Sequence, residues 1–364
     1  MLARDEHSLV RMDRAHLVQE LSRQRAYCEQ RSPLYAAVLR ELEEDAVAGP
    51  DWLASIEAAW RGRSFAVGWE MAHLLLACMH FSALAGEAEE LAALYPSCGG
   101  AGGEPRGAAR AFLRRAPAAF WERLRSGRVQ TNEVDRSVAW MVAAAAAFGG
   151  RNLPFHFVEL GASAGLNLVG DHLPHACRFL SGDGAPVAPP AGWDGVHPIL
   201  TRTGLDLLPR RIAYVGDRLW LKACVWADDL PRLERLDLAI HTFLRFENRL
   251  QLEPCSFAEA PDWLERMRRP GVGEGLLVFN SIATIYLCEE DYRELQRGMA
   301  RALAPWGDRA LWVEYERARG AKDGPLELTI HRSIKGELNT RVVASGAPRP
   351  TAFRFHEATP WQLD

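Results

Sequence analysis

The sequence lacks C-x-x-C pairs, long apolar runs and basic tails, and each absence excludes a class of protein. Without C-x-x-C pairs a zinc knuckle is not expected, and an odd number of scattered cysteines argues against a disulfide framework. The seven cysteines, which we expect to be reduced and mostly buried, are Cys28, Cys78, Cys98, Cys177, Cys224, Cys255 and Cys288. The most apolar helical segment, Met71–Leu84, is too short to cross a bilayer and carries His73 and His80, so no membrane partner is expected.

Charge and the first residues narrow the possibilities further. The 43 Lys and Arg residues against 47 Asp and Glu residues give a net charge of −4, with the basic residues scattered among the acids. Nucleic acid is therefore not the expected partner. Met1–Arg14 is charged and has no apolar core of a secretory signal, so we expect a cytoplasmic protein. At 364 residues and 48% hydrophobic content, the chain can build a sizeable core.

The first 150 residues have helical periodicity and no convincing strand pattern. The expected helices are Ala15–Arg31, which stops before Pro33, Pro50–Trp60, Val67–Leu84, Ala108–Arg125 and Asn132–Phe148. Gly149 and Gly150 end the last of them, and the composition changes there. We therefore predict a helical cap domain over residues 1–150, which would also bind substrate, and a second domain over residues 151–364.

The second part of the chain alternates strands and helices. It opens with the apolar strand Pro154–Leu160, and its last strands, Leu326–Ile330, Thr340–Ala344 and Ala352–His356, follow one another without helices. This succession predicts an α/β fold with a mostly parallel sheet that closes in an antiparallel pair or meander. A parallel sheet ending in an antiparallel hairpin is the outline of the class I methyltransferase fold, which is Rossmann-like.

The motif Val158-Glu-Leu-Gly-Ala-Ser-Ala-Gly-Leu-Asn167 is a glycine-bearing turn between a strand and a helical run. A dinucleotide site requires G-x-G-x-x-G, but Ser163 and Leu166 stand at its second and third glycines. The serine-hydrolase elbow G-x-S-x-G fits literally, with Ser163 as the nucleophile and His331 or His356 as the base. However, the strand entering this turn is the first of its sheet, whereas hydrolases take an oxyanion amide from an earlier strand.

The pattern E/D-x-G-x-G-x-G of S-adenosylmethionine (SAM) sites fits with one mild substitution, serine for glycine. It predicts that the cofactor contacts come from Glu159, Gly161, Ala162, Ser163, Gly165 and Asn167. In such folds an acid near the end of the second strand binds the ribose hydroxyls. Asp183 is the favoured candidate and Asp206 its competitor, although an Asp in glycine-rich sequence also caps turns.

Several sequence blocks resemble a bacterial family catalogued as a domain of unknown function and assigned to the class I SAM-binding fold. They span nearly the whole chain: Ser32–Tyr35, Val129–Val134, Val158–Leu168, Arg202–Asp206 and Trp220–Trp226. The resemblance implies a SAM-binding fold, and that fold in general favours SAM as the co-substrate in methyl transfer to a small molecule. The sequence departs from the family where Asn280 replaces His, where Ala227 replaces Pro, and where a Gly-Asp step is missing near Ser256. These departures concern the adenine contacts, for which Ser256, Asn280 and Ser281 are the candidates.

The chain also resembles bacterial azetidine-2-carboxylate synthases, which are SAM lyases. In that reaction the α-amine of SAM attacks its own Cγ, a four-membered ring forms and methylthioadenosine is released. Methyl transfer and SAM cyclisation both remain open, and a SAM-binding regulator without catalysis is a third hypothesis.

Polar residues before the second domain and two tyrosines are the catalytic candidates. Gln130, Asn132 and Glu133 would face the amino-acid end of SAM, although Asn132 is equally suited to cap a helix. Tyr35 and Tyr286 would offer aromatic faces to the sulfonium. The Asp171-His172-x-x-His175 pattern resembles a metal motif, but Pro174 interrupts it and no further ligand set is evident, so no metal is expected.

Overall fold

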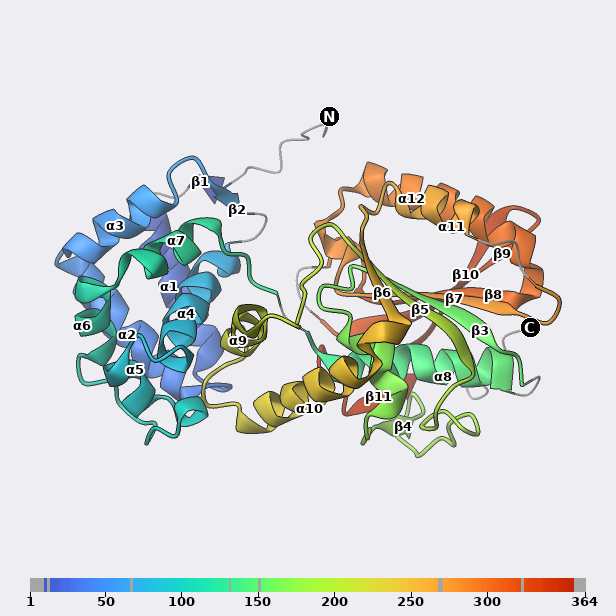
Figure 1. Ribbon diagram of the computed structural model, residues 1–364, viewed down its shortest axis with the longest axis horizontal. Coiled ribbons are helices and arrows are strands. Elements are labelled where there is room, and N and C mark those ends of the chain that lie inside the picture. Colours follow the sequence, from blue (N-terminus) through green and yellow to red (C-terminus); the bar gives the residue numbers. More distant parts are fainter. Residues whose placement is uncertain are drawn as a thin grey trace. The chain divides into compact units, whose positions relative to one another are not determined.

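The computed structural model divides the chain into two compact units (Figure 1). It describes residues 10–11, 14–65, 68–130, 132–149, 152–267, 271–321 and 324–356. The first unit comprises Met1–Thr131 and Ala213–Leu236, and the second comprises Asn132–Ile212 and Asp237–Asp364. This division differs from the predicted boundary at residue 150, because the helix before that boundary belongs to the second unit and a later segment returns to the first.

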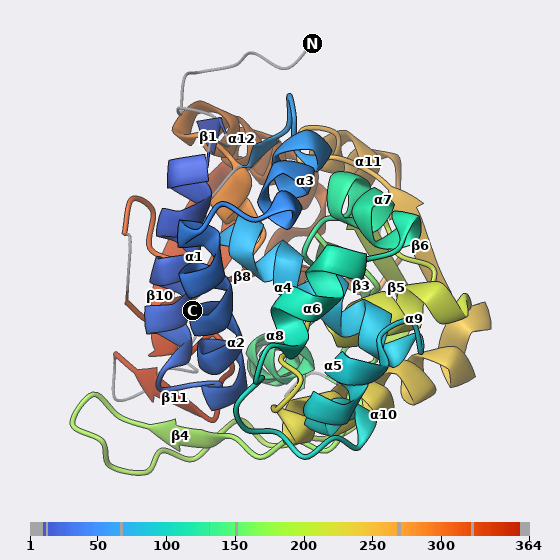
Figure 2. The same ribbon diagram turned by 90° about the vertical axis from the view of Figure 1, so that its left-hand side faces the viewer.

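The first unit is helical (Figure 2). Its helices are α1 (Arg14–Cys28), α2 (Pro33–Val47), α3 (Asp51–Ala59), α4 (Trp69–Leu84), α5 (Glu89–Leu94), η1 (Pro96–Cys98), α6 (Ala108–Arg115), α7 (Ala118–Ser126) and α9 (Val215–Ala223). Helix α4 packs against α1, α5, α7 and α9 and is apolar on nearly all sides. The short strands β1 (Val10–Arg11) and β2 (Ser64–Phe65) pair antiparallel, in a region where the sequence predicted no strand.

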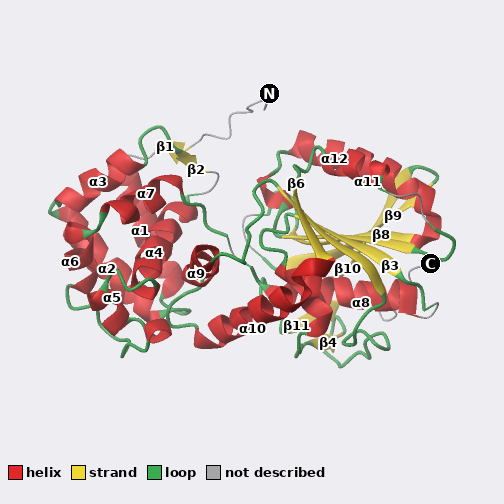
Figure 3. Ribbon diagram, viewed as in Figure 1, coloured by secondary structure: helices red, strands yellow, loops and turns green. Residues whose placement is uncertain are grey.

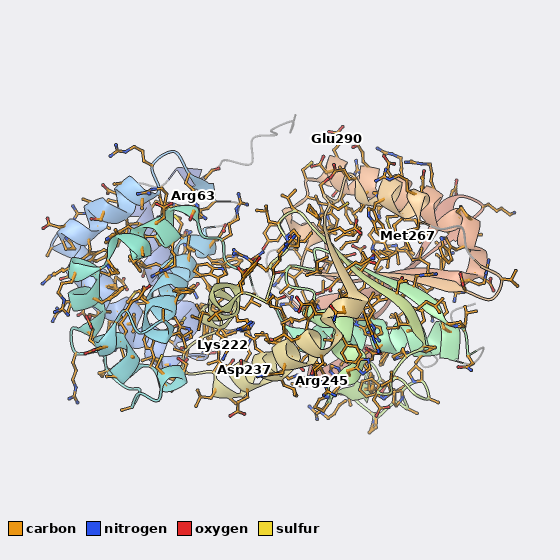
Figure 4. All side chains as sticks on the ribbon, viewed as in Figure 1. Arg63, Lys222, Asp237, Arg245, Met267 and Glu290 are labelled. Atoms are coloured by element: carbon orange, nitrogen blue, oxygen red, sulfur yellow. The ribbon has the colours of Figure 1, made fainter. Side chains whose placement is uncertain are left out.

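Local sequence explains where these helices begin and end. Ser32 caps α2 by accepting a hydrogen bond from the Tyr35 amide at 3.2 Å, and Pro33 occupies the first turn. The predicted helix Ala108–Arg125 is two helices, because Pro117 lacks the amide hydrogen that a continuous helix requires. Arg63, labelled in Figure 4, donates to the Leu124, Arg125 and Gly127 carbonyls at the end of α7.

Buried polar contacts hold the returning segment 213–236 in the first unit. His80 bonds through Nδ1 to the Val225 carbonyl oxygen at 3.0 Å and through Nε2 to Ser97 Oγ at 2.7 Å. His73 Nε2 lies 3.1 Å from the Cys224 carbonyl oxygen. Burial lowers the pKa of each imidazole to about 4, so both are neutral at pH 7. The first unit therefore requires residues that come long after its last N-terminal helix.

The second unit contains a nine-stranded sheet in the order β4-β11-β10-β9-β8-β7-β3-β5-β6 (Figure 3). Its strands are β3 (Phe155–Leu160), β4 (Arg178–Leu180), β5 (Ile199–Asp206), β6 (Leu250–Pro254), β7 (Gly275–Ser281), β8 (Ala310–Arg317), β9 (Leu326–Ile334), β10 (Glu337–Gly346) and β11 (Ala352–Phe355). Strands β6, β5, β3, β7 and β8 are parallel to one another, so the predicted mostly parallel sheet is observed. Numbered along the chain, these five strands have the spatial order 3-2-1-4-5, which reverses at β3.

The rest of the sheet is mainly antiparallel. Strands β9, β10 and β11 form the predicted C-terminal meander next to β8. Strand β4, which the sequence analysis did not predict, pairs parallel with β11 at the edge of the sheet farthest from β6. None of the helices in the described ranges combines the length and apolarity that a membrane span requires.

Helices cover both faces of the sheet (Figure 3). Phe155 and Phe157 of β3 pack with α8 (Ser137–Phe148) on one face. Val158 and Leu160 pack on the other face, in the core that includes α11 (Ala260–Arg266) and α12 (Glu289–Leu303). Helix α8 is apolar almost all round, as expected of a helix that is buried on nearly all sides. The short 3-10 segments of this unit include η2 (Val134–Arg136), η4 (Leu166–His172), η5 (Glu247–Arg249), η6 (Thr284–Tyr286) and η7 (Ala304–Arg309). Helix α10 (Leu230–Phe246) carries the chain from the first unit to the second.

Candidate functional site

The glycine turn follows β3, at the point where the order of the parallel strands reverses. Its backbone is left-handed at Gly161 (φ 71°), Ser163 (φ 52°) and Gly165 (φ 72°). Glycine adopts this conformation without strain, and serine does so at a small cost. The Gly161 and Ala162 amides donate to the Leu205 carbonyl of β5 at 2.8 and 3.1 Å. The turn is thus fixed against the neighbouring strand.

Close packing also requires glycine at two of these positions. A Cβ atom on Gly161 would lie 2.6 Å from Ala283 Cβ, in the segment that follows β7. A Cβ atom on Gly165 would lie 2.8 Å from Leu252 Cδ2 of β6. Both distances are too short for real carbon contacts. The turn after β3 therefore packs against the segment after β7 and against a side chain of β6.

Asp206 ends β5 and bonds directly to the glycine turn. Its Oδ2 accepts from the Ser163 amide at 2.8 Å, and its Oδ1 accepts from the Leu208 amide at 2.8 Å. The Arg210 amide donates to the Ser163 carbonyl at 3.0 Å. Because β5 is the second parallel strand, Asp206 occupies the position that the SAM pattern gives to the ribose-binding acid.

Asp183, the favoured ribose-binding candidate, does not lie there. It follows β4, which is at the edge of the sheet on the far side of β11, β10, β9, β8 and β7 from β3. Its exposed carboxylate accepts from Ser181 Oγ and, at 3.3 Å, from the Ala185 amide, so it closes a turn, and these bonds lower its pKa. The structure thus places Asp206, and not Asp183, next to the turn, because spacing along the sequence cannot tell which strand will pair with β3.

Asn132 forms hydrogen bonds to the glycine turn through both ends of its side-chain amide. Its Nδ2 donates to Ser163 Oγ at 3.2 Å, and its Oδ1 accepts from the Ala164 amide at 3.4 Å. The helix-cap alternative is not what is observed: Glu133 caps η2 (Val134–Arg136), accepting from the Asp135 amide at 3.5 Å. Thr131 lies outside the described residues.

Glu159 is a buried acid just below the turn. It is 2% exposed, and its Oε1 accepts from Asn167 Nδ2 at 2.8 Å. Asn167 is held in turn by Ser137 Oγ at 2.9 Å. In the part of the chain that is described, Glu159 Oε2 has no hydrogen-bond partner. Burial, and to a smaller extent Asp206, raises the pKa of Glu159 to about 8, so this carboxyl is mostly protonated at pH 7.

A second polar cluster lies at the ends of β7 and β8, on the α12 face. Asn280 Oδ1 accepts from Trp312 Nε1 at 2.7 Å, and its Nδ2 donates to Glu314 at 3.1 Å and Glu316 at 2.8 Å. The Asn280 amide is thus committed to side chains, which does not fit the predicted adenine contact. Glu316 Oε1 also accepts from the Ala283 amide at 2.8 Å.

Asn280 is the only residue of this cluster among the predicted site residues; Glu314, Glu316, Tyr292 and His331 were not expected to lie together. Glu314 Oε2 accepts from Tyr292 at 2.6 Å and bonds His331 Nε2 at 2.8 Å. The signal was present as two acids at alternate positions, Glu314 and Glu316, near the end of an otherwise apolar strand.

The remaining predicted residues are not gathered around the turn. Ser256 lies in the turn before α11 and donates to the Glu259 carboxylate through its amide at 2.9 Å and through Oγ at 2.7 Å. Ser281 ends β7 opposite Tyr315 of β8. Tyr286 is 57% exposed in η6. Two candidates belong to the first unit and are described only there: Gln130 lies after α7, and Tyr35 is 1% exposed between Tyr95 and Trp226, where burial raises its pKa well above 10.

The geometry gives no support to a serine hydrolase. Ser163 Oγ accepts a bond from Asn132, and neither proposed base reaches it. His331 is buried on the α12 face between Glu314 and Thr340, each bonded at 2.8 Å. His356 follows β11, which is separated from β3 by four strands.

The metal-like motif has other partners. Asp171 forms a buried ion pair with Arg202, with two bonds of 2.7 Å. His172 stacks on Phe246 with ring centroids 4.2 Å apart, and His175 Nε2 lies 2.7 Å from the Gly170 carbonyl oxygen. No group of three or more metal-ligating side chains occurs within the described ranges.

The sequence was compared with protein families and with curated proteins. The profile of one family, described as an uncharacterized protein conserved in bacteria (DUF2332), matches residues 18–355. No curated protein matches the chain.

Proposed function

We propose that this chain, which belongs to the DUF2332 family, is an enzyme that binds SAM at the carboxyl ends of β3, β5 and β7 and transfers its methyl group to a small-molecule acceptor. One observation carries the proposal: the Asp206 carboxylate lies 2.8 Å from the Ser163 amide of the glycine turn. An acid at the end of the second parallel strand thus adjoins the turn after the first, where the strand order reverses. Open α/β sheets bind nucleosides at this point.

The chemistry of the residues fits the nucleoside and amino-acid parts of SAM. The ribose supplies two hydroxyl donors, which match the two oxygens of the Asp206 carboxylate. Gly161 has no side chain, so the turn can pack directly against Ala283 in the segment after β7. Glu159 adds a buried carboxyl oxygen without a partner in the described structure. The sequence pattern E-x-G-x-S-x-G, which resembles SAM motifs, supports the choice of SAM over other nucleosides.

Methyl transfer sets requirements that these residues would serve. SAM supplies an electrophilic methyl group when bound. The chain must hold the acceptor in line with the bond to that group and exclude water from it. Asn132 would fix the turn on which the methionine part rests, because it bonds both Ser163 and Ala164. The turn would thereby be preorganised.

The products of SAM turnover test the reaction type. Purified protein is incubated with SAM alone and with SAM plus a panel of amine, thiol and phenol acceptors, and the products are analysed by mass spectrometry. S-adenosylhomocysteine formed only with an acceptor supports methyl transfer. Methylthioadenosine and azetidine-2-carboxylate from SAM alone would replace methyl transfer with SAM cyclisation. Binding without any turnover would indicate a regulator, and no binding by calorimetry would overturn the proposal.

Asp206→Asn is expected to weaken SAM binding by about 10- to 100-fold, because hydrogen bonds to a charged group contribute about 1.5–3 kcal/mol. Asp183→Asn is the matched control, and it should leave the affinity unchanged because that residue closes a distant exposed turn. Calorimetry on both variants, with melting curves to verify folding, separates the two acids. The opposite ranking would restore Asp183 as the ribose ligand.

Asn132→Ala is expected to lower turnover by about tenfold or more while changing SAM affinity much less, since a group that orients the reacting centre acts mainly in the transition state. Asn132→Asp is the control, because it keeps an acceptor for the Ala164 amide but loses the donor to Ser163. Rates per folded molecule and melting temperatures are measured together. A lower melting temperature with normal turnover would show that Asn132 only stabilises the turn and does not act in the reaction.

A further inference from the structure

Glu316 is a buried acid without a basic partner in the described structure. It is 7% exposed. Its Oε1 accepts three bonds, from Asn280 Nδ2 and from the amides of Ala283 and Thr284, whereas its Oε2 has no partner among the described residues. The titratable groups around it are Glu314 on β8, Tyr292 on α12 and Glu327, which lies opposite Glu316 on β9. His331 is also near and bonds Glu314. The nearby positive charge is that of Arg319, which donates to the Thr284 and Leu287 carbonyls.

Such a carboxylate is costly to bury unless a proton or a cation compensates its charge. Burial, followed by the like charge of Glu314, raises the pKa of Glu316 to about 7. The group is therefore about half protonated at neutral pH. A cation that reached Oε2 would favour the charged form and release the proton.

The local backbone connects Glu316 to the glycine turn. Ala283, whose amide bonds Glu316, is the residue that a Cβ atom on Gly161 would touch. Ile282 has a φ of 46°, a left-handed conformation that is strained for a β-branched residue. This bend leads into the two successive amides, of Ala283 and Thr284, that bond the Glu316 carboxylate.

The order of the strands fixes on which side of β3 each of the two acids lies. Asp206 is on the β5 side of β3, and Glu316 is on its β7–β8 side. Strands β5 and β8 are three strand spacings apart, or about 14 Å, and each carboxylate bonds to the segment one strand nearer the middle. A ligand whose ribose meets Asp206 would extend its other end across the glycine turn toward Glu316.

We propose, building on the SAM binding proposed above, that Glu316 is the counter-ion for the positively charged methionine end of the ligand. The assignment follows from a buried carboxylate oxygen that has no partner in the described part of the chain, at the end of the site opposite Asp206. Glu159 Oε2 likewise has no partner among the described residues, but Glu159 lies below the turn on the α8 face, with Asn167 and Ser137.

Calorimetry with two ligands tests the assignment. SAM carries the cationic chain, whereas 5′-methylthioadenosine has the same nucleoside without it. Glu316→Gln is expected to weaken SAM binding about 30-fold or more and to change methylthioadenosine binding by less than about twofold. Glu327→Gln, which alters the partly exposed cross-strand neighbour, is the control and should change neither affinity.

Proton release provides a second measurement that does not need the variant to fold. With the wild-type protein at pH 7, SAM binding should release about half a proton, measured in phosphate and in Tris, and methylthioadenosine should release none. SAM affinity should accordingly rise as the pH increases through about 7. If folded Glu316→Gln releases as many protons as the wild-type protein on binding SAM, the protons come from Glu159, and Glu316 is not the counter-ion.

The remaining outcomes separate this inference from the proposed function. If the wild-type protein binds both ligands and Glu316→Gln weakens both equally, Glu316 only supports the segment after β7 and the inference fails alone. If SAM and methylthioadenosine release the same number of protons on binding, the inference also fails alone. If the wild-type protein binds neither ligand, the proposed function fails and the inference fails with it.

Discussion

Gly161→Val abolishes SAM binding in a protein that remains folded: this is the result we expect from calorimetry and circular dichroism. The left-handed backbone at φ 71° disfavours a β-branched residue, and the added Cβ would lie 2.6 Å from Ala283 Cβ. The turn and the segment after β7 must then separate. That movement displaces the turn on which the ligand is proposed to rest.

Gly192→Val is the matched control for this change. Gly192 also has a left-handed backbone, at φ 75°, but its Cβ position has no neighbour within 4 Å. The Gly192→Val protein should therefore be destabilised by backbone strain alone, and its affinity for SAM should be unchanged. Unaltered affinity in folded Gly161→Val would instead show that the ligand does not use this turn.

Arg202→Met is expected to lower the free energy of unfolding by about 3–5 kcal/mol, because it leaves a buried charge without its partner. The side chains of Arg202 and Asp171 are 8% and 0% exposed, and Arg202 also donates to the Leu168 carbonyl. These bonds hold η4, which follows the glycine turn, against β5. Urea unfolding of the variant gives the measurement.

The control for the ion pair is Arg293→Met on α12. Arg293 and Glu289 are paired at 3.1 Å, but their side chains are 65% and 56% exposed, so the loss should be below about 1 kcal/mol. A loss of similar size in the two variants would mean that the Asp171–Arg202 pair is compensated by other groups when it is broken.

The sequence allowed prediction of features that depend on neighbouring residues. The apolar strand Pro154–Leu160 corresponds to β3, and the left-handed backbone at Gly161 and Gly165 explains the glycines of the motif. The final three strands follow one another without helices, and such strands pair antiparallel through short turns. The hydrophobic period of each segment and the residues of its turns are nearly sufficient to predict these elements.

Features that depend on pairing between distant segments were not predicted. Asp183 and Asp206 both follow a strand, and only the order of strands in the sheet distinguishes them. Residues 213–236 contain ordinary amphipathic helix, so their pattern does not indicate which core they join. The partnerless oxygen of Glu316 becomes visible only when the strands on both sides are in place.

The return of residues 213–236 to the first unit bears on how the chain folds during its synthesis. His80 binds the carbonyl of Val225, 145 residues later, so the ribosome must continue for about 7 to 30 seconds before this partner exists. Until then the imidazole is either hydrated in an open helical assembly or buried without a partner, which costs about 1–3 kcal/mol. Strands β3, β4 and β5 emerge within that interval. The N-terminal helices therefore cannot mature as a finished domain before β3, β4 and β5 have been synthesised, and a nascent chain halted near residue 150 would expose an incomplete helical core to chaperones.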